Sequence, residues 1–262
     1  MSALASRLDR VAQNLLGLPY LKLTRGYDIH DRCRYLISLI GEIRQPPALE
    51  ILDVGCGGGL LLRYLDAEAK GRVRRYVGID MRAQRLRTRY GKVGLAHEFH
   101  DVDLDGDWRF GAFDLVWCAE VMEHLVDDRA LFTKIVRSAR PGGTIAITTP
   151  SLAFIKAMGR YVPSLLEVRP VQDGGHVRLG YAPSDFRRLA EEHSLQLVRL
   201  DGITRTDVER VRRRYRGGRL DFMLANVTVG YGRTAGDIYS LGAEFKGRDA
   251  EFWSIAALFR RR

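Results

Sequence analysis

Short apolar runs alternate with helical stretches from Leu49 onward, and this rhythm limits the fold more than any other feature of the sequence. Strands that alternate with helices form βαβ units with right-handed crossovers. The runs that predict buried strands are Leu49–Val54, Tyr76–Ile79, Ala96–Phe99, Phe113–Ala119, Thr144–Thr149, Leu195–Leu200 and Phe252–Phe259. The helices predicted between them are Leu60–Asp66, Arg82–Tyr90, Asp128–Arg140 and Pro183–His193. The sequence therefore predicts an α/β fold with a doubly wound, mostly parallel seven-stranded sheet, whose last strand completes the sheet at its edge.

Two segments do not follow this rhythm. Residues 1–45 carry apolar stripes at helical spacing, which predict a helical cap packed on the core. Residues 201–248 are rich in glycine and arginine and fit neither period, so we interpret them as an insertion or lid over the active-site face. The core would then consist of residues 46–200 and 249–262 within a single domain of ordinary size.

Composition narrows the class of protein. No apolar run approaches the roughly 20 residues that a membrane-spanning helix needs, and charged residues interrupt every stretch that resembles a secretory signal. The three cysteines, Cys33, Cys56 and Cys118, show no paired spacing, which favours a reducing compartment. We therefore expect a cytoplasmic protein. The formal net charge of +10 is compatible with an anionic partner, although a basic surface alone does not select one.

A glycine-rich turn follows the first strand and opens a helix, in the order Asp53-Val54-Gly55-Cys56-Gly57-Gly58-Gly59-Leu60. Glycines permit unusual dihedral angles and a close approach of the backbone to a ligand, and the helix directs its first N–H groups at that ligand. Nicotinamide sites use a similar turn but have Gly or Ala where Leu60 stands here. A carboxylate at Asp53 would repel a pyrophosphate and would suit a cationic amino-acid group.

This stretch resembles motif I of the class I S-adenosylmethionine (SAM)-dependent methyltransferases. The resemblance continues in the same order through Tyr76–Asp80, His100–Asp103, Phe113–Glu120 and Arg140–Thr144. It implies that SAM is the cofactor and S-adenosylhomocysteine the product. It also implies that Asp80 accepts hydrogen bonds from the ribose hydroxyls and that Asp101 faces the adenine amino group. The cofactor-binding residues that the resemblance implies are Asp53, Gly55, Cys56, Gly57, Gly59, Asp80, Met81, Asp101, Val102 and Ala119.

Four side chains are predicted to form the reacting face. Glu120, Glu123 and His124 follow the fourth strand at a spacing that places them on one side of a helical turn, and His176 follows the fifth strand. An oxygen nucleophile needs a base or a metal to remove its proton, so we predict that His124 acts on the acceptor together with Glu120 or Glu123. The same four residues are chemically able to hold a divalent metal ion. Four histidines carry no motif and are predicted to be ordinary polar residues: His30, His97, His100 and His193.

The segment Glu120–Leu125 leaves the substrate open. It resembles a segment of the ubiquinone-biosynthesis O-methyltransferases, and also one of the small-RNA 2′-O-methyltransferases, in which two Glu and two His bind a metal. Seven arginines between positions 205 and 219 could contact phosphate groups of a substrate: Arg205, Arg210, Arg212, Arg213, Arg214, Arg216 and Arg219. We favour O-methylation of a small molecule that bears phosphate or carboxylate. The alternatives are metal-assisted 2′-O-methylation of RNA, a non-catalytic SAM-binding regulator and, more remotely, a nicotinamide oxidoreductase.

Overall fold

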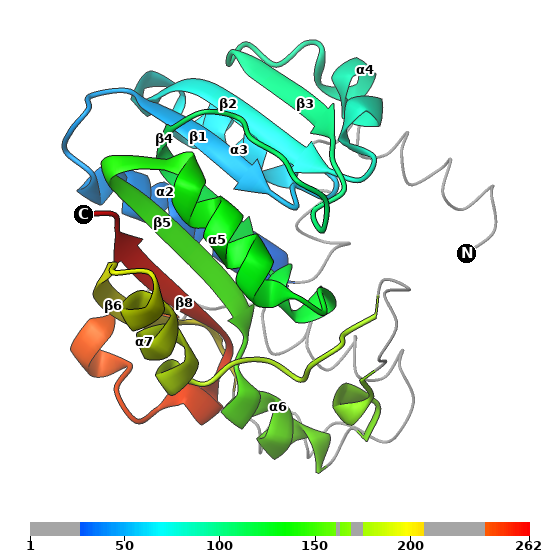
Figure 1. Ribbon diagram of the computed structural model, residues 1–262, viewed down its shortest axis with the longest axis vertical. Coiled ribbons are helices and arrows are strands. Elements are labelled where there is room, and N and C mark those ends of the chain that lie inside the picture. The colour runs from blue at the N-terminus through cyan, green and yellow to red at the C-terminus, as the bar shows by residue number, and fades with distance from the viewer. Residues whose placement is uncertain (1–26, 161–162, 169–174, 207–238) are drawn as a thin grey trace.

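A computed structural model of the chain describes residues 27–160, 163–168, 175–206 and 239–262. Helices lie on both faces of one sheet with the strand order β3-β2-β1-β4-β5-β8-β6-β7 (Figure 1). The strands are β1 (Leu49–Val54), β2 (Val73–Asp80), β3 (His97–Asp101), β4 (Phe113–Ala119), β5 (Ala139–Pro150), β6 (Gln196–Arg205), β7 (Tyr239–Ser240) and β8 (Phe252–Arg260). The α-helices are α2 (Tyr27–Glu42), α3 (Leu60–Glu68), α4 (Leu86–Tyr90), α5 (Asp128–Ser138), α6 (Leu152–Gly159) and α7 (Pro183–Glu192). Single 3₁₀ turns are η1 (Lys70–Arg72), η2 (Ala83–Arg85), η3 (Met122–His124), η4 (Pro163–Leu166), η5 (Gly242–Glu244) and η6 (Asp249–Glu251).

The doubly wound, mostly parallel sheet is confirmed, but the place predicted for the last strand is wrong. Strands β3, β2, β1, β4 and β5 are parallel neighbours, whereas β8 runs antiparallel between β5 and β6. The run Phe252–Phe259 is apolar toward both faces and almost entirely buried, which suits an internal strand better than an edge strand. The two-residue strand β7 occupies the edge instead.

Several predicted boundaries also shift. Strand β5 already begins at Ala139, so the predicted turn Arg140–Thr144 is part of the strand and α5 ends at Ser138. The reason is pairing with the chain end: the Gly142 N–H donates to the Arg261 carbonyl at 2.8 Å. The segment Arg82–Tyr90 divides into η2 and α4. Strand β6 continues to Arg205 because it pairs with β8 as far as Phe252, so residues 201–205 are part of the sheet.

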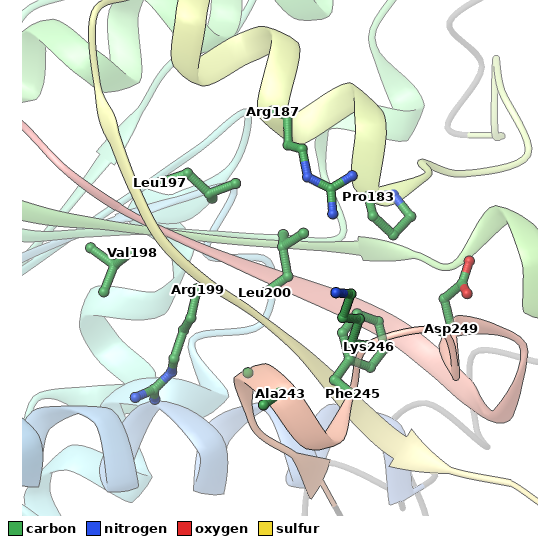
Figure 2. A pocket seen from close by; sticks show the side chains of 12 residues that line it. Pro183, Arg187, Leu197, Val198, Arg199, Leu200, Ala243, Phe245, Lys246 and Asp249 are labelled. Carbon is green, nitrogen blue, oxygen red and sulfur yellow. The ribbon is translucent and has the colours of Figure 1, made fainter.

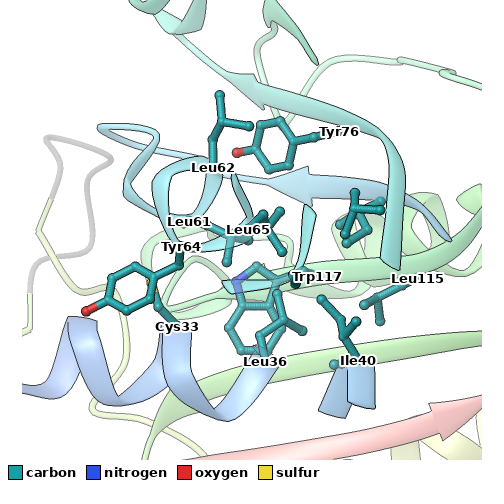
Figure 3. Close-up of a cluster of buried hydrophobic side chains, with 14 of the residues drawn as sticks. Cys33, Leu36, Ile40, Leu61, Leu62, Tyr64, Leu65, Tyr76, Leu115 and Trp117 are labelled. Carbon is teal, nitrogen blue, oxygen red and sulfur yellow. The ribbon is translucent and has the colours of Figure 1, made fainter. Parts of the chain in front are cut away.

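The core has two halves, one on each face of the sheet. Helices α2 and α3 cover one half, where the indole of Trp117 lies beside Leu36 (Figure 3). Helices α5 and α7 cover the other half. The predicted packing of an apolar helical stripe on the core is confirmed in α2 by Cys33, Leu36 and Ile40, while the part of the predicted cap within residues 1–26 lies outside the described residues. No helix in the described ranges combines the length and apolar character needed to cross a membrane.

A buried lysine fixes the loop after β3. Lys134 of α5 is only 6% exposed, and its ammonium donates to the carbonyl oxygens of Leu104, Asp105 and Gly106 at 2.7, 3.2 and 2.8 Å. These hydrogen bonds are charge-assisted and therefore stronger than those between neutral groups. The loop that follows Asp101 is thereby held against α5.

Candidate active site

The glycine-rich turn has the shape of a ligand cradle. Gly55, Gly57 and Gly59 all have positive φ angles, 75°, 53° and 69°, which only glycine adopts without strain. A Cβ atom at Gly55 would collide with Val121, and one at Gly59 would lie 2.8 Å from the Tyr90 ring. At Gly57 nothing lies within 4 Å of that position. The turn is therefore packed tightly on two sides and open at its centre, where the cofactor is expected.

Two carboxylates lie beneath and beside this turn. Asp80, at the end of β2, accepts the Gly57 N–H at 3.0 Å. Asp53 is 4% exposed and accepts the Tyr76 hydroxyl at 2.6 Å. Burial raises the pKa of Asp53 to about 7; the hydrogen bond from Tyr76 opposes this shift, and the charge of Asp80 adds to it. Asp80 therefore lies against the backbone of the turn, whereas Asp53 is buried against the Tyr76 hydroxyl.

The other predicted cofactor residues gather at the same edge of the sheet. Asp101 is exposed and accepts the Gln84 N–H at 2.7 Å. Met81 is 70% exposed at the end of β2. Half-buried Val102 donates its N–H to the Asp80 carbonyl at 3.0 Å, and half-buried Ala119 ends β4.

Cys56 is placed differently from its neighbours in the turn. Its side chain is 8% exposed and packs into the hydrophobic core. Its N–H donates to the Ile79 carbonyl at 3.0 Å, and its carbonyl accepts the Gly59 N–H at 2.8 Å. A contact between Cys56 and the cofactor stays a prediction. The side chain of Cys56 is buried, and both its N–H and its carbonyl already have partners within the protein.

Glu123, His124 and His176 converge beyond the end of β4. Their ligand atoms lie within 4.8 Å of one another, a group able to hold a metal ion. The imidazole rings of His124 and His176 meet edge to face with centroids 4.7 Å apart. Because a carbonyl can only accept, the 3.0 Å contact between His124 Nδ1 and the Gly175 oxygen requires a proton on Nδ1. In the neutral ring this leaves the Nε2 lone pair free to take a proton or bind a metal.

Glu123 is the least solvated member of this cluster. The residue is fully buried, and neither carboxylate oxygen has a hydrogen-bond partner. Burial raises its pKa well above the ordinary value of 4.5, and repulsion from Glu120 adds to this; the positive charges of Arg32 and Arg178 oppose the shift. Burial, and then the neighbouring His124, lowers the pKa of His176. A polar site of this kind is satisfied by a proton or by a cation.

Glu120 does not join the cluster, in contrast to the predicted arrangement on one side of a helical turn. It has a φ of 54°, and η3 begins only at Met122, so the chain turns between Glu120 and Glu123. Its carboxylate accepts the Ser254 hydroxyl at 3.0 Å and pairs with Arg32 at 3.8 Å. Glu120 therefore links the end of β4 to α2 and β8.

The segment that carries His176 is fastened to the loop after β4. The Val177 N–H donates to the Glu123 carbonyl at 2.9 Å. Arg178 donates to the carbonyls of Leu125 and Val126 at 2.9 and 3.0 Å and pairs with Asp128. These contacts fix the position of His176 relative to Glu123.

Three residues of the site were not predicted from the sequence. Arg32 and Ser254 were unassigned because their partner Glu120 is remote in sequence; the signal available for Ser254 was a hydroxyl within an apolar strand. Arg178 was visible beside His176 but was given no role. Its contacts with two carbonyls and one carboxylate show that it holds the loop.

Other predicted features lie elsewhere. Arg205 ends β6 and pairs with Glu251 at 3.2 Å, while the remaining six arginines of the predicted cluster lie outside the described residues. The four histidines without a motif make ordinary contacts. His30 bonds to the Tyr64 hydroxyl, His97 to the Leu95 carbonyl and His100 to Glu98, and His193 packs on Phe132.

Comparison with known proteins shows that this chain is similar to methyltransferases. Residues 52–147 match the family described as "Methyltransferase domain". A ubiquinone biosynthesis O-methyltransferase of Alkalilimnicola ehrlichii is 31% identical over 193 residues, which is 67% of this chain and 72% of that protein. The enzyme of the same name from Methylococcus capsulatus is 30% identical over 158 residues, which is 58% of this chain and 65% of that protein. The match thus spans slightly less than two thirds of the Methylococcus relative.

Solved structures share the architecture. The N-methyltransferase NodS from Bradyrhizobium japonicum, in complex with S-adenosyl-L-homocysteine, superimposes with a TM-score of 0.55 and covers 97% of both chains. The sequence identity is 16%, so this likeness concerns the fold alone.

Proposed function

Because this chain belongs to the class I SAM-dependent methyltransferases, we propose that it transfers the methyl group of SAM to a hydroxyl oxygen of a small molecule. The observation that carries this proposal is the cluster of Glu123, His124 and His176 at the end of β4, next to the glycine-rich turn. Relatives named ubiquinone biosynthesis O-methyltransferases support oxygen as the acceptor atom. Methyl transfer depends mainly on positioning, so the protein has to align the acceptor and manage one proton.

The cofactor would lie across the carboxyl ends of β1, β2 and β3. The ribose hydroxyls would donate to Asp80, and adenine would lie between Met81 and the loop after Asp101. The open space at Gly57 suits the methionine part of SAM, since a side chain there would fill it. This placement directs the sulfonium toward the loop that follows β4.

The acceptor proton has a suitable destination. As the hydroxyl oxygen forms its bond to the methyl carbon, the carbon–sulfur bond breaks and sulfur keeps the electron pair. The proton of the hydroxyl moves to Nε2 of His124, whose Nδ1–H is held by the Gly175 carbonyl. His176 forms the adjacent wall, and burial followed by the neighbouring His124 lowers its pKa.

The same cluster fits a divalent metal ion. One buried carboxylate without a hydrogen-bond partner and two imidazoles are a donor set that zinc, iron, manganese and similar ions accept. A bound ion would lower the pKa of a coordinated hydroxyl and so assist its ionisation. Glu123 would supply the negative charge, and Arg178 would hold the His176 segment in place.

The experiment uses the purified protein, methyl-labelled SAM and an extract of its host, with products separated into small-molecule, lipid, protein and nucleic-acid fractions. We expect label in small molecules. Label in RNA would replace the proposal by ribose methylation, and binding of SAM with no labelled product would favour a regulatory role.

Matched variants test the proton path. His124→Gln should lower kcat by about 10²–10⁴-fold, the usual contribution of a general base, with little change in the Kd for SAM. Glu98→Gln, at the remote edge strand β3, is the control and should leave kcat unchanged. If H124Q weakens SAM binding as much as it lowers kcat, His124 does not act on the acceptor side.

A further inference from the structure

A cavity of about 360 Å³ lies over β6, near the β7 edge of the sheet. The glycine turn follows β1, which lies in the other half of the strand order. Its walls come from the start of α7, the middle of β6 and the segment 242–249 (Figure 2). None of the candidate catalytic or cofactor residues lines it. Its volume is at the small end of the range of about 300–1,000 Å³ that is usual for small-molecule sites.

The floor of the cavity is apolar. Leu197 and Leu200 of β6 lie beneath it, and Phe245 closes one wall (Figure 2). Phe245 is 3% exposed and packs edge to face on Phe252 with ring centroids 5.6 Å apart. The Gly242 N–H donates to the buried carboxylate of Asp201 at 2.7 Å. The wall is therefore built into the fold before any ligand arrives.

Two cations face this floor from opposite walls. Arg187 descends from α7, and Lys246 extends from the segment after η5, so that both end groups border the space over Leu200 (Figure 2). Neither has an ion-pair partner within the part of the chain that the structure describes. The third cation, Arg199, is already neutralised by Asp201 at 2.7 Å and by Glu42 at 2.7 Å.

The distribution of charge limits the ligand. Two unpaired cations over an apolar floor suit one anionic head attached to an apolar body. Asp249 lines the same cavity and would repel a second anionic group there. The volume excludes a folded partner, and two cations are too few to balance the charge of a triphosphate.

We propose that this cavity is a second binding site, separate from the methyl-transfer site, for a small amphiphilic carboxylate. The head would lie between Arg187 and Lys246, and the apolar part would cover Leu197, Leu200 and Phe245. This inference does not depend on which molecule the protein methylates.

Calorimetry with decanoate, below its micelle concentration and without SAM, tests the proposal. Decanol, with the same tail and no charge, and acetate, with the head alone, are the matched probes. We expect saturable 1:1 binding of decanoate, with decanol and acetate each at least about tenfold weaker, because head and tail both contribute.

Variants locate the site. The pair Arg187→Gln and Lys246→Gln should weaken decanoate binding by about tenfold or more, the effect of losing charge-assisted hydrogen bonds. The pair Arg34→Gln and Lys92→Gln removes the same charge from other exposed positions and should leave binding unchanged. Ala243→Trp, which fills the cavity without changing charge, should abolish binding.

Three results would each overturn the proposal. They are equal affinity of all variants for decanoate, equal binding of decanol, and binding to phosphatidylglycerol vesicles without any binding of monomeric decanoate. Unchanged melting curves of the variants establish that a lost signal reflects the cavity and not unfolding.

Discussion

Replacing Glu123 by methionine should stabilise the protein while it removes activity. The carboxyl group is fully buried, and neither oxygen has a hydrogen-bond partner. A buried polar group left without a partner costs about 1–3 kcal/mol, and methionine fills a similar volume without polar oxygens. For a protein of this size, 1 kcal/mol corresponds to about 2–4 °C in Tm. We therefore expect Glu123→Met, measured after dialysis against chelator, to melt roughly 2–12 °C above the wild type.

The pH dependence gives this prediction a sign. Because the folded-state pKa of Glu123 is raised, its contribution to stability is present below its ordinary pKa of 4.5 and is lost as the pH rises through the folded-state value. The advantage of E123M should therefore grow as the pH rises above about 4.5.

The control for this experiment keeps the polar atoms in place. Glu123→Gln retains the buried oxygen and should gain little stability, although its activity should also be lost. Thermal unfolding followed by circular dichroism over a pH series measures both variants. A Tm for E123M equal to or below the wild type at neutral pH would refute the reasoning, because it would mean that the carboxyl group is satisfied in the folded protein.

Four further changes test other parts of the structure. Asp80→Ala should weaken SAM binding by at least about tenfold, since the expected hydrogen bonds to ribose are lost; unchanged affinity by calorimetry would refute the placement of the cofactor. Asp53→Asn should be increasingly more stable than the wild type as the pH rises from about 4 through 7, because the pKa of Asp53 is raised to about 7 and its stabilising contribution disappears over that window; parallel stability curves would contradict this. Lys134→Met should cost at least about 2 kcal/mol in urea unfolding, because three carbonyls lose their donor; a loss below about 0.5 kcal/mol would show that water replaces the ammonium. Ser254→Ala should lower the free energy of unfolding by about 0.5–1.5 kcal/mol by removing the hydrogen bond to Glu120, and an unchanged value would show that Arg32 alone holds that carboxylate.

Local sequence patterns were sufficient for most elements of the fold. The predicted bounds of β1 and β4 are those of the structure, because each apolar run is bounded by residues that end a strand. Helix α2 could also be predicted from local sequence, because its apolar residues recur at helical spacing.

The position of β8 between β5 and β6 was not visible, because strand order depends on pairing partners and not on local periodicity. The candidate site divides in the same way. The residues of the glycine turn and of the segment after β4 could be identified from their motifs. The separation of Glu120 from Glu123 could not, because it results from a positive φ angle and from partners as remote as Ser254, 134 positions away.

The internal position of β8 also has a consequence for how the molecule assembles. Strand β5 pairs with β8 from Thr144↔Arg260 to Pro150↔Ser254, so its second edge stays open until a segment about a hundred residues later is in place. Such long-range pairing is slow to form, and an open internal edge is prone to pair with other chains meanwhile. The same insertion brings the Ser254 hydroxyl to Glu120. A folding intermediate without β8 can therefore already contain the glycine turn, but Glu120 gains its partner Ser254 only after β8 has paired with β5.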